Sequence, residues 1–198
     1  MENHEYLNAK KRVQNFINNE ISFYVLPDVE RLTHEIRPDS NGQRGCTVPL
    51  AMMLFSIIDF FGFLMRDDKN ARKTETLRNF EYLISKSGYF PKVYSEGKNC
   101  EKLVKLFRHG IVHQFFPKAC GISKAGIKCP LIYENSSGTK KTPILNVDIL
   151  SKDLVDAISK IQEVISENKE GSKELILRMN SRLDLLAKED YEDLDKLA

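Results

Sequence analysis

Cysteine is scarce in this sequence, with only four among 198 residues. Cys46, Cys100, Cys120 and Cys129 form no CxxC pair, and the partner ligands of a zinc motif are missing. We therefore expect reduced thiols in a cytoplasmic protein. The sequence also lacks a Gly-rich phosphate loop with the G-x-x-x-x-G-K spacing, and no Ser-His-Asp or Cys-His nucleophile pattern stands out.

Long apolar runs are equally scarce. The longest, LAMMLFSIIDFFGFLM at residues 50–65, is shorter than the roughly 20 residues that a membrane helix needs, and Asp59 lies in its middle. The first residues, MENHEYLNAKKR, lack the apolar stretch of a secretory signal. These features predict a buried core helix, no membrane partner and a cytoplasmic location.

The net charge is only +2, so overall charge predicts no partner. Its distribution is uneven, because residues 98–141 contain nine lysines and arginines against two glutamates. Residues 148–198 reverse the balance, with eight basic and 13 acidic residues. The basic block is typical of a surface that contacts a phosphate-rich partner. A solvated lysine-rich loop is the alternative interpretation.

Apolar spacing predicts helices along most of the chain. The first carries Tyr6, Val13, Ile17, Ile21 and Tyr24, and Pro27 is expected to break it or to start a short second piece. Thr47 and Pro49 suit the N-terminus of the apolar core helix. A third helix is expected at about residues 71–86, with Leu77, Phe80 and Ile84 pointing inward.

The fourth predicted helix covers about residues 99–116 and ends at Pro117, with Cys100, Leu103, Phe107, Ile111 and Gln114 on one face. A hairpin is expected next, from CPLIYE and TPILNVDIL on either side of a polar turn. Ser151 could cap a fifth helix, and a sixth follows Gly171. We therefore predict an all-α protein with a small β-hairpin insertion, folded as a single domain over residues 1–198.

The fourth helix contains an unusual cluster of polar residues in the segment KLFRHGIVHQFFPK. Arg108 and His113 enclose four residues, and the residue after the arginine, His109, is polar. Histidine has a pKa of about 6.5 and can act as a general acid or base. Arginine stays charged and can hold two phosphate oxygens at once. These residue types can together supply proton transfer and a grip on a phosphate group.

The R-H-x-x-x-H pattern late in a helix resembles the R-x(4–6)-H signature of the HEPN superfamily, whose helical bundles occur in many prokaryotic toxins and defence ribonucleases. The resemblance covers about 20 residues, and the helix order extends it to a core of roughly 45–170 with the N-terminal and C-terminal helices packed on it. It implies an endoribonuclease that leaves a 2′,3′-cyclic phosphate and a 5′-hydroxyl. It also implies a homodimer, because two copies of the motif meet across the HEPN dimer interface. RNA, an antitoxin or an activating protein are the implied partners, and DNA is not.

Arg108 and His113 are the expected catalytic residues, with support from Asp59, His109 and Lys118. A carboxylate among the phenylalanines of the core helix needs a cationic partner, and Arg108, His109 and His113 are the candidates. The resemblance makes Asp59 an orienter of Arg108, whereas a structural aspartate bonded to Ser56 or to backbone is the alternative. No cofactor is expected. His109 and His113 lie four residues apart and could share a metal, but no third ligand is evident, so no metal site is predicted.

Two other functions remain open. A non-catalytic HEPN module could keep the bundle and bind nucleotide or a protein partner. A helical scaffold could carry RHGIVH simply as an ion-paired stretch of helix.

Overall fold

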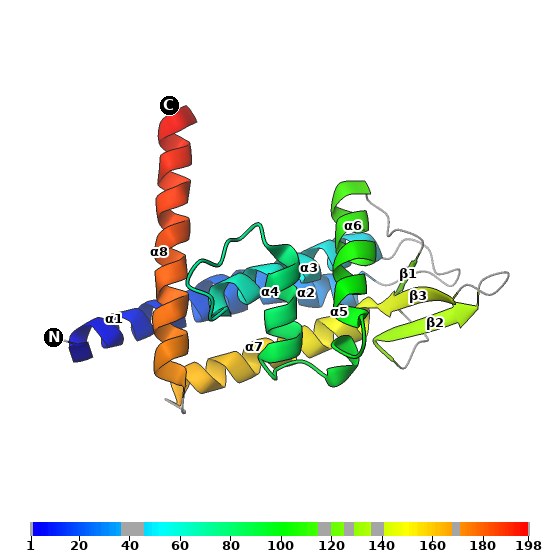
Figure 1. Ribbon diagram of the computed structural model, residues 1–198, viewed down its shortest axis with the longest axis horizontal. Helices are drawn as coiled ribbons and strands as arrows, with labels where there is room; N and C mark the ends of the chain where they lie inside the picture. Colours follow the sequence, from blue (N-terminus) through cyan, green and yellow to red (C-terminus); the bar gives the residue numbers. More distant parts are fainter. Residues whose placement is uncertain are drawn as a thin grey trace.

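The computed structural model describes residues 2–36, 46–114, 120–124, 129–135, 141–167 and 171–197. Over these residues the chain is mainly helical, with a small three-stranded sheet at one end (Figure 1). Buried apolar side chains from the N-terminal, central and C-terminal helices form one cluster. The prediction of a mainly helical fold with a small β element is confirmed, although the sheet has one strand more than the expected hairpin.

The chain opens with one long helix made of four segments, α1 (Glu2–Asn15), η1 (Phe16–Val25), α2 (Leu26–Glu30) and η2 (Arg31–Glu35). The η1 and η2 segments have wide π-type turns, and the Leu26 amide donates to the carbonyl oxygen of Ile21. Backbone angles stay helical at the junctions, so the helix passes through Pro27. The predicted break there is wrong, because the wide turn accommodates the proline ring and its missing N–H. The alternative, that Pro27 starts a short piece, agrees with its position in the first turn of α2.

Every fourth residue of this helix faces the core. The buried set is Ala9, Val13, Ile17, Ile21, Val29 and Thr33. In an α-helix with 3.6 residues per turn, side chains four residues apart are displaced around the helix axis by about 40° from one to the next. A π-type turn contains more residues, so it displaces these side chains in the opposite direction around the axis. The π-type segments therefore keep the buried stripe facing the core. The same change of phase leaves Tyr24, predicted on the buried face, 62% exposed.

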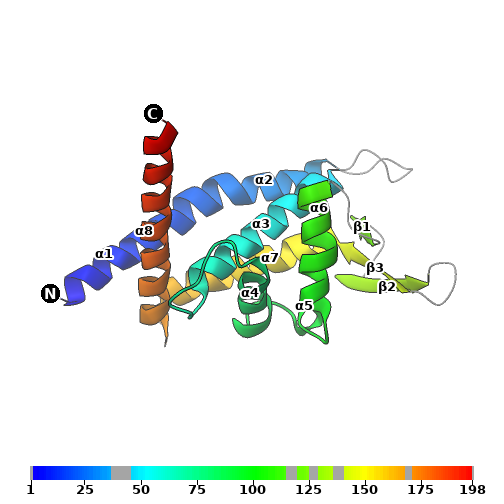
Figure 2. The same ribbon diagram turned by 45° about the horizontal axis from the view of Figure 1, so that its top comes forward.

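The core helix α3 (Thr47–Met65) begins where the sequence predicted. Its length and apolar composition would allow it to cross a membrane, but 61% of its most apolar window is buried inside the fold. The bundle surrounds it on several sides (Figure 2). This extent of burial is typical of the core helix of a soluble protein.

The third predicted helix begins later than expected. Residues 66–75 form an irregular loop, and the helix consists of α4 (Thr76–Phe80) and η3 (Glu81–Lys86). Phe80 and Ile84 are buried as predicted, and Leu77 is partly buried. A 3₁₀ turn, η4 (Lys92–Tyr94), is the one regular element of the following irregular segment.

The fourth helix, called the motif helix below, comprises α5 (Asn99–Lys102), η5 (Leu103–Arg108) and α6 (His109–Gln114). The predicted inward stripe is confirmed for four of its members, Cys100, Leu103, Phe107 and Ile111. The side chain of Gln114 and all of Pro117 lie outside the described residues. The stripe fixes which side of this helix faces α3 and therefore where its polar residues can lie.

The sheet has the strand order β1-β3-β2, from β1 (Gly121–Ser123), β2 (Leu131–Asn135) and β3 (Lys141–Asn146). The antiparallel β2–β3 pair confirms the predicted hairpin and places Tyr133 opposite Pro143. Strand β1 pairs with β3 in parallel and was not predicted. A three-residue strand is too short to show the alternation by which strands are found in a sequence.

Helix α7 (Val147–Ser166) follows β3 without a loop. The side-chain oxygen of Asn146 accepts from the amides of Asp148 at 3.0 Å and Ile149 at 3.3 Å, so Asn146 is the N-cap. The prediction of Ser151 as the cap, with VDIL in the strand, is therefore wrong. Ser151 is buried inside the helix, and its hydroxyl lies 3.0 Å from that of Thr33.

Helix α8 (Ser172–Leu197) begins after Gly171, whose positive φ of 78° turns the chain. Ile176 and Met179 are buried as predicted, while Leu183 and Leu186 are partly buried. Figures 1 and 2 show α8 crossing α1 and extending beyond the other helices. Its backbone is helical through the acidic tail, whose side chains from residue 190 onward lie outside the description.

Candidate functional site

The carboxylate of Asp59 lies at the centre of the candidate site. It comes from the middle of α3, and its side chain is only 12% exposed. Nη2 of Arg108 lies 3.3 Å from its Oδ2. Thr76 donates to the same oxygen at 2.8 Å, and the Asn79 amide donates to Oδ1, also at 2.8 Å. The structure thus joins Asp59 to Arg108 and adds two neutral donors that the sequence analysis missed.

Gly62 lets α4 come close enough to reach Asp59. A Cβ atom at this position would lie 2.1 Å from the backbone carbonyl oxygen of Asn79. Gly62 follows Asp59 by three residues, and Asn79 follows Thr76 by three, so each pair shares a helix face. The close contact between these faces leaves Asn79 completely buried. The sequence signal for this contact was the three-residue spacing of Asp59 and Gly62 on one helix and of Thr76 and Asn79 on the other. It can be recognised only when the two helices are known to pack together.

A buried arginine continues the network behind Asn79. Arg66 donates to the side-chain oxygen of Asn79 at 2.9 Å and forms ion pairs with Asp68 at 2.8 Å and Glu75 at 2.7 Å. The backbone amide of Asn70 and the Arg66 guanidinium together lower the pKa of Asp68. The pKa of Glu75 is lowered chiefly by its hydrogen bond from Arg66. Both carboxylates therefore stay ionised and hold Arg66 in place.

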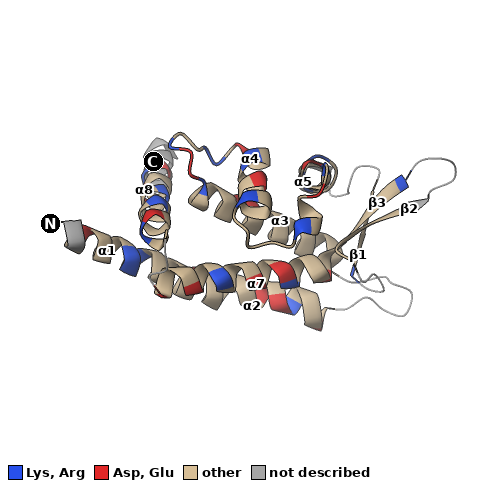
Figure 3. Cartoon of the chain, turned by 60° about the horizontal axis from the view of Figure 1, so that its bottom comes forward, with Lys and Arg blue, Asp and Glu red and all other residues tan. Residues whose placement is uncertain are grey.

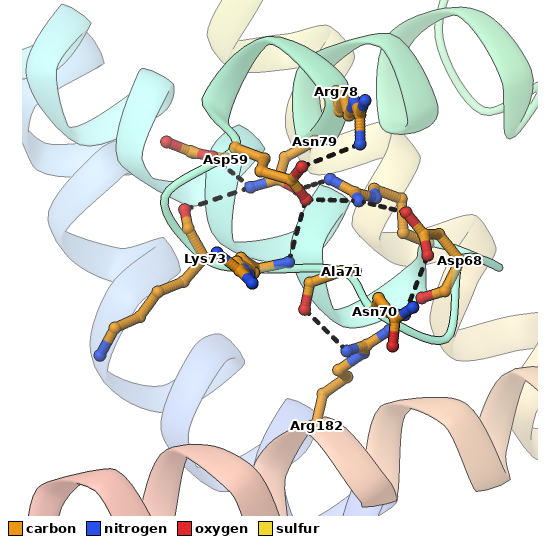
Figure 4. A network of polar contacts seen from close by, with 11 residues as sticks. Asp59, Asp68, Asn70, Ala71, Lys73, Arg78, Asn79 and Arg182 are labelled. Atoms are coloured by element: carbon orange, nitrogen blue, oxygen red, sulfur yellow. Dashed lines mark hydrogen bonds and ion pairs between the residues drawn. The ribbon is translucent and has the colours of Figure 1, made fainter.

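Helix α8 secures the loop that carries these groups. Arg182 donates to the carbonyl oxygen of Ala71 at 2.9 Å and also to that of Asp68. Arg178 donates to the carbonyl oxygen of Met65 at 2.6 Å, at the end of α3. Figure 4 shows the labelled members of this network, with Asp59 beside Asn79 and Arg182 below the loop. The supports of Asp59 thus reach from the core helix to the C-terminal helix.

An open cleft of about 700 Å³ lies where the motif helix meets α4 and its preceding loop. It is lined by Lys73, Thr74, Glu75, Thr76, Leu77, Arg78, Arg108 and His109. Two of its cations already have partners: Lys73 lies 2.7 Å from the exposed carboxylate of Glu189, and Arg78 lies 2.8 Å from Glu75, which is only 27% exposed and is also held by Arg66. Exposed ion pairs contribute little to stability, so an incoming anion can displace Glu189 from Lys73. We call this surface the Arg108 cleft.

Arg108 is placed differently from the other cations of the cleft. Its side chain is 22% exposed, against 52% for Lys73 and 66% for Arg78. Among the described side chains, Asp59 is its one hydrogen-bond partner. A guanidinium has five N–H donors, so Asp59 can fix its orientation while other donors serve a ligand. This arrangement suits the recognition of a phosphate group.

The remaining predicted site residues have mixed outcomes. His109 lines the Arg108 cleft together with Arg108. Position 113 lies in α6, one turn beyond position 109, but its side chain is outside the description. Lys118 lies outside the described residues altogether. Ser56, the alternative partner of Asp59, donates instead to the carbonyl oxygen of Met52 at 2.9 Å. Within the described part of the chain, no group of three or more potential metal ligands occurs.

A second hollow, of about 540 Å³, lies between the N-terminal helix and α7. The hydroxyls of Thr33 and Ser151 meet at its wall, and three carboxylates, Glu30, Asp148 and Asp156, also line it. Figure 3 shows acidic residues along α2 and α7, on the side of the molecule away from α5. Among the described lining residues, Lys152 is the one lysine beside these carboxylates, whereas the Arg108 cleft has Lys73, Arg78 and Arg108 against Glu75. Carboxylates repel phosphate groups, so the Arg108 cleft is the stronger candidate for an anionic ligand.

Comparison with known proteins assigns no family to this fold and site. Neither a protein-family model, nor a curated protein, nor a solved structure matches the chain.

Proposed function

We propose that this chain is a metal-independent endoribonuclease of the HEPN type that acts as a homodimer. The observation that carries the proposal is the ion pair between Arg108 and Asp59 at the edge of a cationic cleft. In the resemblance to HEPN proteins, the motif arginine is supported by a polar residue of the preceding core helix. We infer the same role for Asp59 on α3, because it pairs with Arg108 in the second half of the motif helix.

RNA cleavage without a metal needs a base, an acid and a cation near one phosphodiester bond. A base removes the proton of the 2′-hydroxyl, the 2′-oxygen attacks phosphorus, and an acid protonates the departing 5′-oxygen. His113 is assigned to proton transfer, and Arg108 neutralises the charge that develops on the phosphoryl oxygens. The products are a 2′,3′-cyclic phosphate and a 5′-hydroxyl. Lys118 is assigned to contacts with substrate phosphates, and His109 and Asp59 are assigned to the support of Arg108 and His113.

The dimer is implied by the resemblance to HEPN proteins, and the positions of the two motif residues are compatible with it, as they also are with an Arg108 side chain that curls back or a helix that relaxes at Gly110. Residues 108 and 113 are about 140° apart around an ideal helix of about 100° per residue, so they do not share a face. A second motif helix, related by a two-fold axis, would bring His113 of one subunit towards Arg108 of the other. We propose the cytoplasm as the location, and an antitoxin or an activating protein as the regulatory partner. Neither DNA nor a membrane is expected to bind.

The test is RNA cleavage in EDTA. The wild-type protein should cut RNA and leave DNA intact, because only RNA has the 2′-hydroxyl nucleophile. Arg108→Ala and His113→Ala should each abolish cleavage, whereas the matched controls Arg31→Ala and His4→Ala, at exposed positions of the N-terminal helix, should cut normally. Cleavage that requires Mg²⁺ would identify a metal nuclease instead. Nucleotide binding without cleavage under any condition would identify the non-catalytic module.

A further inference from the structure

A tyrosine is held in a fixed orientation on the opposite flank of the motif helix. Tyr133 stands on β2 opposite Pro143 on β3, and 38% of its surface is exposed. Its hydroxyl donates to the side-chain oxygen of Asn99 at 2.8 Å. The same hydroxyl accepts from Nζ of Lys102 at 2.8 Å, and this ammonium lies 4.6 Å from the ring centroid. The ring is therefore positioned before any ligand arrives.

The ring forms part of a hollow of about 460 Å³ that is lined by Lys102, Leu106, Tyr133, Lys141 and Pro143. We call these five residues the tyrosine platform. Among the side chains that the structure describes, the lining combines one aromatic ring, two apolar side chains and two ammonium groups, without a carboxylate. Figure 3 shows basic and acidic residues at α5 and a basic residue on β3. The platform is suited to a flat aromatic group that carries negative charge beside it.

We propose that the tyrosine platform binds single-stranded RNA, with a base stacked against Tyr133 and the adjoining phosphates held by Lys102 and Lys141. Proteins that bind single strands combine these elements, because every base has a face that can stack and every nucleotide has a phosphate. The bonds to Asn99 and Lys102 restrict the ring in advance, so less conformational entropy is lost on binding. The proposal rests on the proposed ribonuclease function, since it describes how that enzyme would hold its substrate.

The platform and the Arg108 cleft share the motif helix. Lys102 and Leu106 line the platform, and Arg108 and His109, two to seven residues further along the same helix, line the cleft. Figures 1 and 2 show α4 on one side of the motif helix and the sheet on the other. A helix with its side chains is about 10 to 12 Å across, which a few nucleotides can span. A strand cut at Arg108 can therefore cross the helix and rest its flanking nucleotide on Tyr133.

The experiment measures binding separately from cleavage. A labelled 2′-O-methyl single strand cannot be cut, because its 2′-oxygen has no proton to lose, so fluorescence anisotropy reports affinity alone. Tyr133→Ala should weaken binding by roughly tenfold or more, in line with the loss of one stacked base. Tyr133→Leu should weaken it similarly while keeping an apolar contact with Pro143. Tyr133→Phe keeps the ring and should stay within about threefold of wild type.

The lysines are tested by the salt dependence of binding. Lys102→Ala and Lys141→Ala should each lower the slope of log affinity against log salt by about one. The matched controls are Tyr24→Ala, which removes an exposed ring of the N-terminal helix, and Lys152→Ala on α7. Both should bind like wild type, and thermal melts should confirm that each variant is folded.

Several outcomes would overturn the platform. Unchanged affinity in folded Tyr133→Ala and Tyr133→Leu would show that no base stacks there. Equal losses in Tyr133→Phe and Tyr133→Ala would assign the effect to the hydroxyl contacts. Competition by an acidic peptide, with no dependence on the ring, would indicate a protein partner instead.

Tyr133-dependent binding without any RNA cleavage would support the platform and reject the ribonuclease. RNA cleavage together with binding that does not depend on Tyr133 would support the ribonuclease and reject the platform.

Discussion

The guanidinium of Arg108 and the carboxylate of Asp59 lie 3.3 Å apart, although the two residues are 49 positions apart in the chain. A pair so largely removed from water is stable only when hydrogen bonds satisfy the remaining atoms of the carboxylate. Thr76 and Asn79 provide these bonds. Asp59 is thus a rigid anchor for Arg108, which has consequences for stability as well as for chemistry.

Replacing Asp59 with alanine should destabilise the fold by about 3 kcal/mol, because it leaves the largely buried Arg108 without its carboxylate partner and the buried Asn79 amide with only its longer bond, at 3.3 Å, to the carbonyl oxygen of Lys73. Chemical denaturation measures this change. The control is Asp28→Ala, which removes an exposed carboxylate from α2 and should change stability by less than about 0.5 kcal/mol. If both variants unfold at the same denaturant concentration, Asp59 does not anchor Arg108.

Gly62→Ala should separate α3 from α4. The added Cβ would lie 2.1 Å from the carbonyl oxygen of Asn79, so the helices must move apart. We expect a loss of about 1 to 3 kcal/mol, typical of overpacking in a core. RNA cleavage should fall too, because Asn79 and Thr76 would move away from Asp59. Ser56→Ala, at an exposed position of the same helix, is the control for both readouts. A Gly62→Ala protein with wild-type stability would show that the two helices are not in close contact.

The cysteines should differ strongly in their reactivity. Burial raises the pKa of the Cys120 thiol to about 11. Burial and the nearby charge of Glu81 raise that of Cys100 to about 11. The thiolate is the reactive form, and at pH 8 it is roughly a thousandth of a thiol population with such a pKa. Exposed Cys129 should be alkylated by iodoacetamide at least about tenfold faster than either, as measured by mass spectrometry.

The pH dependence of alkylation gives an independent check. Below a pKa of about 11, each added pH unit should raise the alkylation rate of Cys120 by about tenfold until the fold itself opens. Equal rates for Cys120 and Cys129 at pH 8 would show that the environment of Cys120 is not apolar.

The helices were predictable because their apolar stripes are long. Leu103, Phe107 and Ile111 mark the inward face of the motif helix in the sequence and in the structure alike. Predictions failed where the usual preference of one residue type was outweighed by packing in the folded chain. Pro27 is usually a helix breaker, yet wide turns carry the helix through it. Ser151 is a good N-cap residue, but the apolar stripe continues back to Val147, and Asn146 caps the helix instead.

The candidate site was predictable in part for a similar reason. An aspartate amid the apolar residues of the core helix required a cation, and Arg108 was one of few available. The roles of Thr76 and Asn79 could not be found, because ordinary polar residues on a short helix give no signal until Gly62 brings that helix against α3. The cations Lys73 and Arg78 were missed because both fall within the helix predicted at about residues 71–86. In the structure Lys73 lies in the loop before α4 and Arg78 lies in α4 itself.

The proposed dimer can be tested by combining two inactive subunits. A purified heterodimer of one Arg108→Ala chain and one His113→Ala chain retains one intact pair, with Arg108 and His113 on different subunits. If each site is shared between subunits, this heterodimer should regain about half of the wild-type activity, because one of the two symmetric sites is whole. Each homodimeric variant should stay inactive. Neither variant alone can supply this activity, so its recovery reports the geometry of the site directly.

The matched control pairs a wild-type chain with a chain that carries both substitutions. It retains Arg108 and His113 on the same subunit, whereas each shared pair lacks one member. A shared site therefore predicts an inactive control and an active complementing heterodimer. Activity confined to the control would place both residues of each site in one chain, and light scattering that showed only monomers would exclude the dimer. The two heterodimers have the same composition of substitutions, so a difference between them can arise only from how the residues are divided between the subunits.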